Sequence, residues 1–413
     1  MEIRPLSGYR YDATKVGDVG RVVSPPYDQY DDALQAVAYD QSPHHFVRLI
    51  LPRDTNPHQA AAKTLGEWTH GGVLVKEPAP AIYPYSQVYT EPRGGERERH
   101  GFLALLKLTP LDGGPVYPHE RTMPKTMAER LGLLRATKAD LGPVFVTFAD
   151  EEGAVSDLLA SVHEAAAVVS VSDRDGNAHH LWTQTDPRWH EQLSYLLRNA
   201  DAVIADGHHR YKAALQYADE LQAGDDHPAR WKLVAFFPAF EENVTVLPIH
   251  RVVKDWPADA DPKKFFNINA MQFWRPEDAE HAVGHTAGTL GQYSQTTGTE
   301  VWAHKFGAPQ VWDGDPSDTY RRLPAAAFEA SVLRGLVGMT PEDIGAKKGL
   351  RFVKTVGEAK RLLWQGFDRA FFLPPTPVGD IIAAAKAGEV MPQKSTYFYP
   401  KVLSGLVSYL HDR

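Results

Sequence analysis

The chain has no cysteine among its 413 residues. Disulfides, cysteine-ligated zinc and cysteine nucleophiles are therefore excluded, as is typical of a protein in a reducing compartment. No stretch approaches the ~20 apolar residues of a membrane-spanning helix. The N-terminal segment MEIRPLSGYRYDATKVGD also lacks the apolar core of a signal peptide. These absences predict a cytoplasmic protein with no membrane partner.

The chain also has no excess of basic residues. The chain has 44 Lys and Arg against 52 Asp and Glu, which gives a formal net charge of −8. Proteins that coat nucleic acid usually present a net basic surface, so a nucleic-acid partner is not expected. The 43% hydrophobic content is that of a globular protein with a sizeable core.

Strand-like and helix-like patterns alternate along the chain, and this interleaving predicts an α+β (mixed α/β) fold. A Pro-, Asp- and Trp-rich texture sets residues 255–322 apart, which predicts three parts: 1–254, a small β-rich subdomain or insertion at 255–322, and an α/β portion at 323–413 that packs on the core. The patterns predict strands at 22–23, 46–51, 81–85, 102–108, 144–148, 203–205, 300–305, 351–354, 369–373 and 396–399, with a strand pair in 166–185. They predict helices at 56–70, 149–165, 325–337, 356–364 and 378–387, and one opened by a capping box at 126–129.

One junction carries a chemical signal, DAVIADGHHRYKAALQYADELQAG at 201–224. A buried strand at 203–205 turns at Asp206-Gly207 and continues into an amphipathic helix, so His208 and His209 fall in the helix's first turn. Free N–H groups and the helix dipole attract anions there. Arg210 adds a planar cation that suits phosphate oxygens, so the pattern predicts a phosphate-binding site.

Plainer interpretations remain open for this junction. Asp206 can be a simple N-cap, and the two histidines can be polar surface residues at a helix start. Cations at a helix N-terminus are unfavourable without an anion, however, which favours the phosphate-binding interpretation. A zinc site is a weaker hypothesis because adjacent histidines diverge on a helix.

The segment ADGHHRYKAAL resembles the phosphate-binding motif of the ParB/sulfiredoxin superfamily, in which a Gly-x-x-Arg turn opens a helix against a nucleotide. Within that superfamily it is most similar to free serine kinases. The whole chain resembles the family catalogued as domain of unknown function 1015. The matching segments, in chain order, are VVSPPYD (22–28), FVRLIL (46–51), YPHERT (117–122), AERLGLLRAT (128–137), IADGHHRYKAAL (204–215), LPIHRVV (247–253) and MPQKSTYFYPKVLSGLV (391–407).

This resemblance implies a nucleotide-binding core over 1–254 and a kinase that phosphorylates free L-serine to O-phosphoserine. ATP or ADP would be the co-substrate, with Mg²⁺ and no redox cofactor. The chain has neither a GxxxxGK[ST] loop nor the protein-kinase signature set. Two alternatives are a non-enzymatic nucleotide or anion sensor and a ParB-like nucleotide switch. Sulfiredoxin-like repair is excluded because it needs a cysteine.

In this interpretation Gly207, His208, His209 and Arg210 bind the phosphates. The loop VYPHERTMPK (116–125) supplies further candidates. A carboxylate near the attacking hydroxyl can take its proton, so Glu120 is the candidate base, with His119 and Asp206 as further catalytic candidates. Either Glu120 or Asp206 can instead be an Mg²⁺ ligand, and an exposed polar loop is an equally plain interpretation.

Substrate-binding candidates complete the hypothesis. The stretch SPPYD forms a rigid turn that presents Tyr27 and Asp28, although a purely structural turn explains it as well. Arg48 is a lone charge in an apolar run and either faces solvent or binds a carboxylate.

Four more residues are included as candidates. Arg121 and Thr122 are added for substrate binding, and Lys394 and Ser395 for the nucleotide. The oligomeric state is not predicted.

Overall fold

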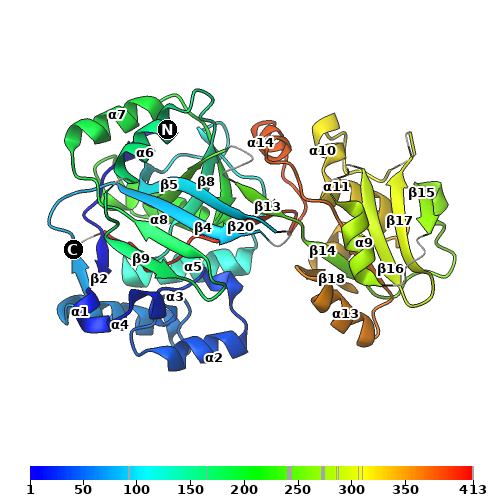
Figure 1. The fold of residues 1–413 in the computed structure, drawn as a ribbon, viewed down its shortest axis with the longest axis horizontal. Helices are drawn as coiled ribbons and strands as arrows, with labels where there is room; N and C mark the ends of the chain where they lie inside the picture. Colours follow the sequence, from blue (N-terminus) through cyan, green and yellow to red (C-terminus); the bar gives the residue numbers. More distant parts are fainter. Residues whose placement is uncertain are drawn as a thin grey trace. The chain divides into compact units, whose positions relative to one another are not determined.

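The structure, a computed structural model, describes residues 1–413 apart from 92–93, 164, 240–243, 271–274, 285, 287, 306, 309 and 412–413. The chain forms two compact units. Unit 1 comprises Met1–Pro118, Thr122–Thr245 and Pro400–Arg413, and unit 2 comprises His119–Arg121 and Val246–Tyr399. Both units combine helices with β-sheets, which confirms the predicted α+β class (Figure 1).

Unit 1 contains most of the sequence motifs. Its strands are β1 (Ile3–Arg4), β2 (Tyr9–Tyr11), β3 (Leu74–Lys76), β4 (Tyr83–Thr90), β5 (Glu96–Lys107), β6 (Val116–Tyr117), β7 (Ala139–Asp140), β8 (Val144–Phe148), β9 (Val169–Ser172), β10 (Ala178–Leu181), β11 (Ala202–Asp206), β12 (Trp231–Pro238) and β21 (Tyr409–Leu410). Its helices are α1 (Ala13–Val16), α2 (Asp32–Gln41), α3 (Val47–Ile50), α4 (Pro57–His70), α5 (Pro124–Thr137), α6 (Ala154–His163), α7 (Pro187–Leu197) and α8 (His208–Glu220), with 3₁₀ turns η1 (Val19–Arg21), η2 (Tyr27–Gln29) and η3 (Pro228–Arg230).

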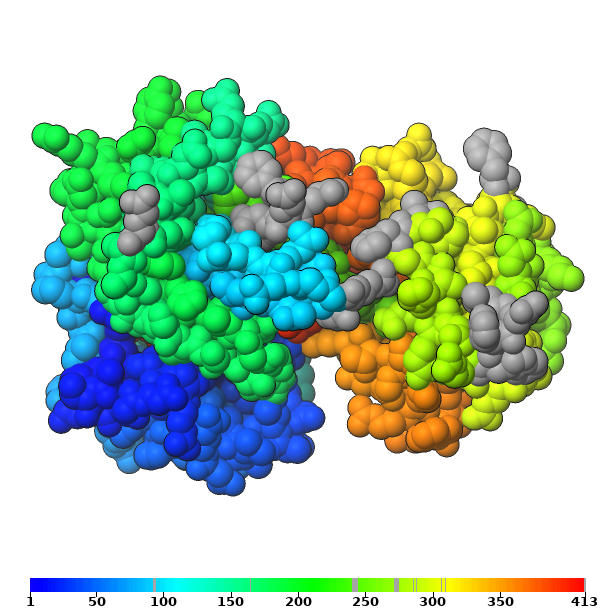
Figure 2. Space-filling view, viewed as in Figure 1, coloured from blue at the N-terminus to red at the C-terminus, as the bar shows by residue number. Residues whose placement is uncertain are grey.

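A mixed sheet forms the centre of unit 1, with the strand order β6-β11-β8-β12-β5-β4-β10-β9 and with β1 beside β5. The pairs β6–β11 and β8–β12 are parallel, and the other pairs are antiparallel. Successive strand residues point to opposite faces. Ala104 and Leu106 therefore join the core formed with α5, α6, α7 and α8. Helices α3 and α4 enclose a separate core with β2 and β3, and α2, with Ala38 as its only buried residue, lies at the surface (Figure 2).

Unit 2 is built on an antiparallel sheet with the order β15-β17-β16-β19-β14-β18. Its strands are β13 (Thr245–Leu247), where the chain passes from unit 1 to unit 2, β14 (His250–Val253), β15 (Phe266–Ala270), β16 (Thr289–Ser294), β17 (Gly298–His304), β18 (Leu350–Val353), β19 (Arg369–Phe372) and β20 (Tyr397–Tyr399). Its helices are α9 (Pro276–Val283), α10 (Asp318–Arg322), α11 (Pro324–Phe328), α12 (Pro341–Gly345), α13 (Val356–Trp364) and α14 (Val378–Lys386), with the 3₁₀ turn η4 (Pro262–Lys264) and the π-helix η5 (Glu329–Arg334).

Both faces of the unit 2 sheet are covered by helices. Phe371 packs with Phe328 and Val332 on one face, whereas Ala370 and Phe372 pack on the other face with α9 and α13. The sheet joins strands from 255–322 with strands from 323–413, two stretches that the sequence pattern had assigned to separate parts.

Three local predictions are wrong. Residues 46–51 form α3 rather than a strand, because a short apolar run buried on several sides has no periodicity that separates the two forms. Val22 and Val23 follow η1 and belong to no strand. Helix α5 begins at Pro124 with Met123 as its N-cap, ahead of the predicted capping box at 126–129; proline at the first helical position was the better signal.

A buried ion pair crosses the core of unit 1. Lys232 lies within the fully buried strand β12, and its ammonium donates to the carboxylate of Asp140, which also accepts the N–H of Leu233 at 2.9 Å. The side chains are only 4% and 2% exposed. Burial lowers the pKa of Lys232, and the nearby carboxylate opposes that shift. A charge buried this deeply is strongly destabilising unless an opposite charge lies beside it.

We expect Asp140→Asn to destabilise unit 1 by about 3–5 kcal/mol, because Lys232 would keep a buried charge without a counter-ion. Urea unfolding measures this change. Glu67→Gln is the control: it breaks the exposed Lys63–Glu67 pair and should change the free energy of unfolding by less than about 1 kcal/mol. Equal effects of the two substitutions would contradict the assignment.

Candidate phosphate-binding site

The strand–helix junction predicted from the sequence is present in unit 1. Strand β11 ends at Asp206, Gly207 is the N-cap of α8 with φ 94° and ψ 28°, and the helix begins at His208. A Cβ on Gly207 would lie 2.9 Å from Nε of Arg210. Both the left-handed backbone and the close guanidinium therefore require glycine. The N-cap interpretation of Asp206 is wrong, since Gly207 occupies that position.

Two cations share the carboxylate of Asp206. Lys401 donates to Oδ1 and Arg210 donates to Oδ2 at 2.5 Å. Arg210 also donates to the carbonyl of Pro143 at 2.5 Å. Burial alone would raise the pKa of Asp206, but the charges of Lys401 and Arg210 outweigh it and hold that pKa well below its usual value. Asp206 is therefore a permanent anion that orients both cations.

A row of polar side chains on β5, β4 and β10 determines where Lys401 lies. Arg99, Gln87 and His179 are neighbours across these strands. Arg99 donates to Gln87 Oε1 at 2.7 Å and to the carbonyl of Pro400, and Gln87 donates to the carbonyl of Lys401 at 3.1 Å. Burial lowers the pKa of Arg99 to about 10. The sheet thus fixes the backbone of 400–401.

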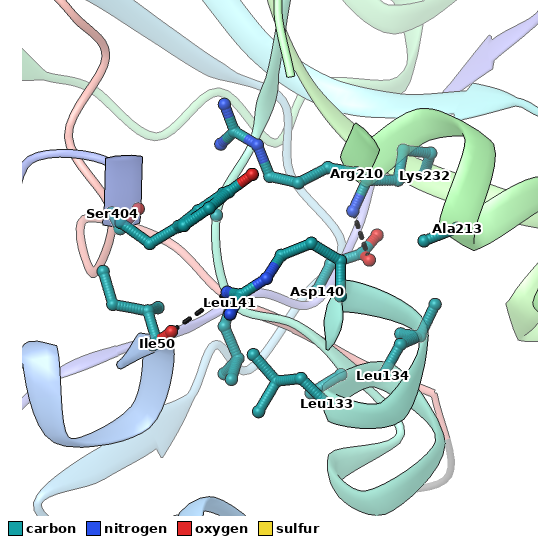
Figure 3. Close-up of a pocket in the computed structure, with 13 residues that line it drawn as sticks. Ile50, Leu133, Leu134, Asp140, Leu141, Arg210, Ala213, Lys232 and Ser404 are labelled. Carbon is teal, nitrogen blue, oxygen red and sulfur yellow. Dashed lines mark hydrogen bonds and ion pairs between the residues drawn. The ribbon is translucent and has the colours of Figure 1, made fainter. Parts of the chain in front are cut away.

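A cavity of about 50 Å³ lies beside Arg210 (Figure 3). Such a volume accommodates a few waters or one phosphate-sized group and is far below the ~300–1,000 Å³ of pockets for whole drug-sized ligands. Arg130, Arg210 and Lys232 supply three cations to its wall against the single carboxylate of Asp140. Lys232 pairs with Asp140 and Arg210 with Asp206, so the charge of Arg130 is the one that favours an anion here.

Two buried donors strengthen that inference. Nε of Arg130 and Nε of Arg210 have no hydrogen-bond acceptor in the part of the chain that the structure describes. Arg130 donates through Nη1 to the carbonyl of Ile50 at 3.0 Å, and its guanidinium lies 4.0 Å from the ring centre of Tyr27. Buried polar groups without partners are rare in proteins and point to a bound water or ion.

Tyr27 lines the same cavity. Burial, aided by the neighbouring Asp28, raises its pKa to about 12. The Tyr27 hydroxyl therefore stays protonated at neutral pH and can donate a hydrogen bond. Asp28 itself is exposed.

The loop that follows residue 121 contacts α8. Met123 donates its N–H to Nε2 of His209 at 2.9 Å, and Nζ of Lys212 donates to Thr122 Oγ1 at 3.1 Å. His208 is buried, whereas His209 is half-buried.

The remaining candidates of this loop belong to unit 2. His119 is fully buried, with Nε2 3.0 Å from Thr396 Oγ1. Glu120 forms a parallel β-bridge with Met391. Arg121 lines a separate cavity of unit 2.

Lys394 and Ser395 also belong to unit 2. Lys394 has φ 55°, and its carbonyl accepts from Arg251 at 3.0 Å. Ser395 is buried and donates to the carbonyl of Pro392 at 2.6 Å. The Lys394 bond thus joins its backbone carbonyl to a distant guanidinium, whereas the Ser395 bond is to the local backbone.

Arg48 lies in α3 and not in a strand. It donates to the carbonyl of Tyr39 at 2.7 Å and to that of Ser42, and its guanidinium lies 4.3 Å from the ring centre of Tyr39. These contacts stabilise the C-terminal end of α2, where cations are favoured. Arg48 is not among the described residues that line the cavity beside Arg210.

Sequence reasoning missed four charged residues of this site: Lys401, Arg130, Lys232 and Asp140. Lys232 did have a sequence signal, since it is a single charge in an otherwise apolar strand. A lysine is seldom buried without a partner, so this pattern could have predicted a buried ion pair. Lys401 had no comparable signal, since its partner lies far away in the sequence.

Within the described residues, no three His, Cys, Asp or Glu side chains gather into a metal site. Mg²⁺ in nucleotide-dependent enzymes is usually bound through one or two carboxylates together with substrate phosphates. Asp206 already bonds to two cations, which makes it a poor Mg²⁺ ligand.

The fold and this site define an α+β protein with a cation-lined cavity at a strand–helix junction. The chain belongs to the family described as a protein of unknown function, DUF1015, whose family model matches residues 3–314. No curated protein matches the chain. Among the helices that the structure describes, none has the length and apolar character needed to span a membrane.

Comparison with solved structures gives weak similarities. A mutant free serine kinase in complex with ADP has 12% identity and a TM-score of 0.37, covering 72% of this chain and 87% of that one. A conserved hypothetical protein from Pyrococcus furiosus has 14% identity and a TM-score of 0.37, covering 75% and 96%. SbnI with a C-terminal truncation from Staphylococcus aureus has 13% identity and a TM-score of 0.35, covering 73% and 86%. Similarities of this size do not define the fold or the activity of this chain.

We expect Asp206→Asn to remove about 3 kcal/mol of stability at neutral pH, because Lys401 and Arg210 would lose a mostly buried counter-ion. The folded-state pKa of Asp206 lies below its unfolded value of 3.8. Its contribution is therefore fully present above about pH 4 and is lost as the pH falls through the folded pKa. Urea unfolding of both proteins between pH 7 and pH 3 should show their difference shrinking at the acid end. A difference that is constant with pH would contradict the assignment.

Gly207→Ala should cost about 1–3 kcal/mol of stability, since alanine must adopt a positive φ and displace the Arg210 guanidinium. Thermal unfolding is the measurement. Gly66→Ala on α4 is the matched control, because φ is not positive at this helical position and a Cβ there meets nothing within 4 Å. This control should unfold at the same or a higher temperature. A similar loss in both variants would refute the role assigned to Gly207.

Proposed function

We propose that this chain is a nucleotide-dependent kinase that transfers a phosphoryl group from ATP or ADP to the hydroxyl of free L-serine, giving O-phosphoserine. The observation that carries the proposal is the pair of buried Nε donors, on Arg130 and Arg210, at a cation-lined cavity beside the N-terminus of α8. The choice of free L-serine as the acceptor of the phosphoryl group rests on the resemblance of ADGHHRYKAAL to the phosphate-binding motif of free serine kinases.

In this proposal Arg210 and the first turn of α8 bind the phosphates of the nucleotide. The helix dipole and the guanidinium both favour negative charge. Phosphoryl transfer proceeds through a loose transition state, so positioning and charge neutralisation supply most of the catalysis. Gly207 permits the close approach of Arg210 to the backbone. His208 and His209 are the remaining phosphate-binding candidates of this turn.

Asp206 acts as a positioning residue and not as a general base. An efficient general base has a pKa near the working pH. The pKa of Asp206 lies far below that range because Lys401 and Arg210 stabilise its anionic form.

Glu120 takes the proton from the serine hydroxyl. As the serine oxygen bonds to the terminal phosphorus, the bond from that phosphorus to the bridging oxygen breaks, and the shortened nucleotide leaves with the electron pair. Tyr27, Asp28, Arg121 and Thr122 are candidates for holding the substrate.

Holding Mg²⁺ is the alternative role for Glu120. When bound, Mg²⁺ neutralises charge on the phosphate oxygens.

Glu120→Gln should lower the rate of phosphoserine formation by about 10²–10⁴-fold, because the hydroxyl would lose its proton acceptor. The binding of ADP should persist. ³¹P NMR of the protein with Mg²⁺, ATP or ADP and a panel of L-serine, L-threonine, homoserine and glycerate follows the phosphomonoester product. Calorimetry measures nucleotide binding in parallel.

Glu151→Gln, at an exposed position of unit 1, is the control and should leave the rate unchanged. No transfer to any acceptor by the unaltered protein, together with clear nucleotide binding, would overturn the kinase proposal in favour of a nucleotide sensor.

A further inference from the structure

A second cavity lies wholly within unit 2, with a volume of about 340 Å³. This volume falls within the ~300–1,000 Å³ range of small-molecule pockets. Its wall combines charged and aromatic side chains, among them Arg121, Trp312, Tyr320, Glu329, Arg334 and Glu389. Cavities of this size with a few converging polar groups are the usual form of a ligand site.

The π-helix η5 contributes two charges to this cavity. Glu329 and Arg334 are the first and last residues of η5, and both line the cavity. In an α-helix of 3.6 residues per turn, residues five apart face different directions, whereas a π-helix closes its turn between i and i+5. The π-helix therefore brings this acid and this base to one wall. π-helical turns are rare in proteins, and those that occur often lie at functional sites.

Most charges of the cavity already have partners. Arg334 forms an ion pair with Asp313 at 2.7 Å. The carboxylate of Glu389 accepts from the N–H and the hydroxyl of Ser317, both at 2.6 Å. These residues form the frame of the cavity and are not available to a ligand.

Glu329 and Arg121 differ from the rest. Neither side chain makes an ion pair or a hydrogen bond with any residue that the structure describes. Burial raises the pKa of Glu329, while Arg251, Arg334 and Arg121 oppose this shift. Arg121 is thus near enough to act on Glu329 electrostatically, yet no ion pair joins the two. An unpaired acid and an unpaired base on one cavity wall match a ligand that carries both charges.

We propose that this cavity binds a small zwitterion, with its ammonium group at Glu329 and its anionic group at Arg121. The rings of Trp312 and Tyr320, 6.2 Å apart at their centres, also line the cavity, and the guanidinium of Arg321 lies 5.6 Å from the centre of the Trp312 ring. Arg121 is also a serine-binding candidate of the proposed kinase, but the site goes beyond that function, because it is built from unit 2 alone and its ligand needs neither a nucleotide nor a hydroxyl.

The test is calorimetry on the full chain without nucleotide. The probes are glycine, β-alanine and 4-aminobutyrate, zwitterions of increasing length without a hydroxyl, with 1,4-diaminobutane and succinate as ligands of a single charge sign. At least one zwitterion should bind with a Kd below about 1 mM. Both Glu329→Gln and Arg121→Gln should weaken that binding at least about tenfold.

Glu277→Gln, which removes the exposed ion pair with Lys360, is the control and should bind as tightly as the unaltered chain. Circular dichroism confirms that each variant is folded, and exposed Arg121 keeps the test open if Glu329→Gln unfolds. Failure of every probe at about 10 mM would overturn the proposal. Diaminobutane binding as tightly as the zwitterions, with no effect of Arg121→Gln, would also overturn it. Because no phosphoryl transfer is measured, the result is independent of the kinase proposal.

Discussion

The carboxylate of Asp206 is the interaction on which the site of unit 1 depends. It accepts from Arg210, four residues further along the chain, and from Lys401 near the C-terminus. These contacts join the β11–α8 junction to a segment almost two hundred residues away. The bonds of Arg99 and Gln87 to the backbone of 400–401 add a second attachment from the central sheet. Contacts from three parts of unit 1 thereby hold the guanidinium of Arg210 in position.

Burying a charged side chain costs free energy, and unit 1 buries several charged side chains around Asp206. Lys232 is compensated by Asp140, and Arg210 by Asp206. Among the described residues, Arg130 contacts the carbonyl of Ile50 and the ring of Tyr27, and burial lowers its pKa. The cavity wall is left with an excess of positive charge and two donors without described acceptors. An anionic group in the cavity would offset that charge, which favours a phosphate-binding role over a purely structural one.

The sequence predicted the strand–turn–helix junction at 201–224 because each part has a local signal: apolar residues, a glycine at a turn and helical periodicity. Strand β8 and helix α13 were predicted to the residue for the same reason. Side-chain partners over long separations leave no such signal, so Lys401 and Arg130 were missed. The α3 segment was mistaken for a strand because four of the five residues at 46–50 are buried. Burial on nearly every position shows neither a helical nor a strand period. The roles of His119, Glu120, Lys394 and Ser395 stay predictions.

The central claim is that the Arg210 guanidinium, oriented by Asp206, binds phosphate. Calorimetric titration of ADP into the unaltered chain, Arg210→Lys and Arg135→Lys tests it most directly. Arg135 is an exposed residue of α5 and pairs with Glu220, so its substitution controls for the loss of a guanidinium elsewhere. The account predicts that Arg210→Lys weakens ADP binding at least about tenfold, because an ammonium cannot reproduce the planar fork. It predicts unchanged affinity for Arg135→Lys. Equal ADP affinity in all three proteins would contradict the account.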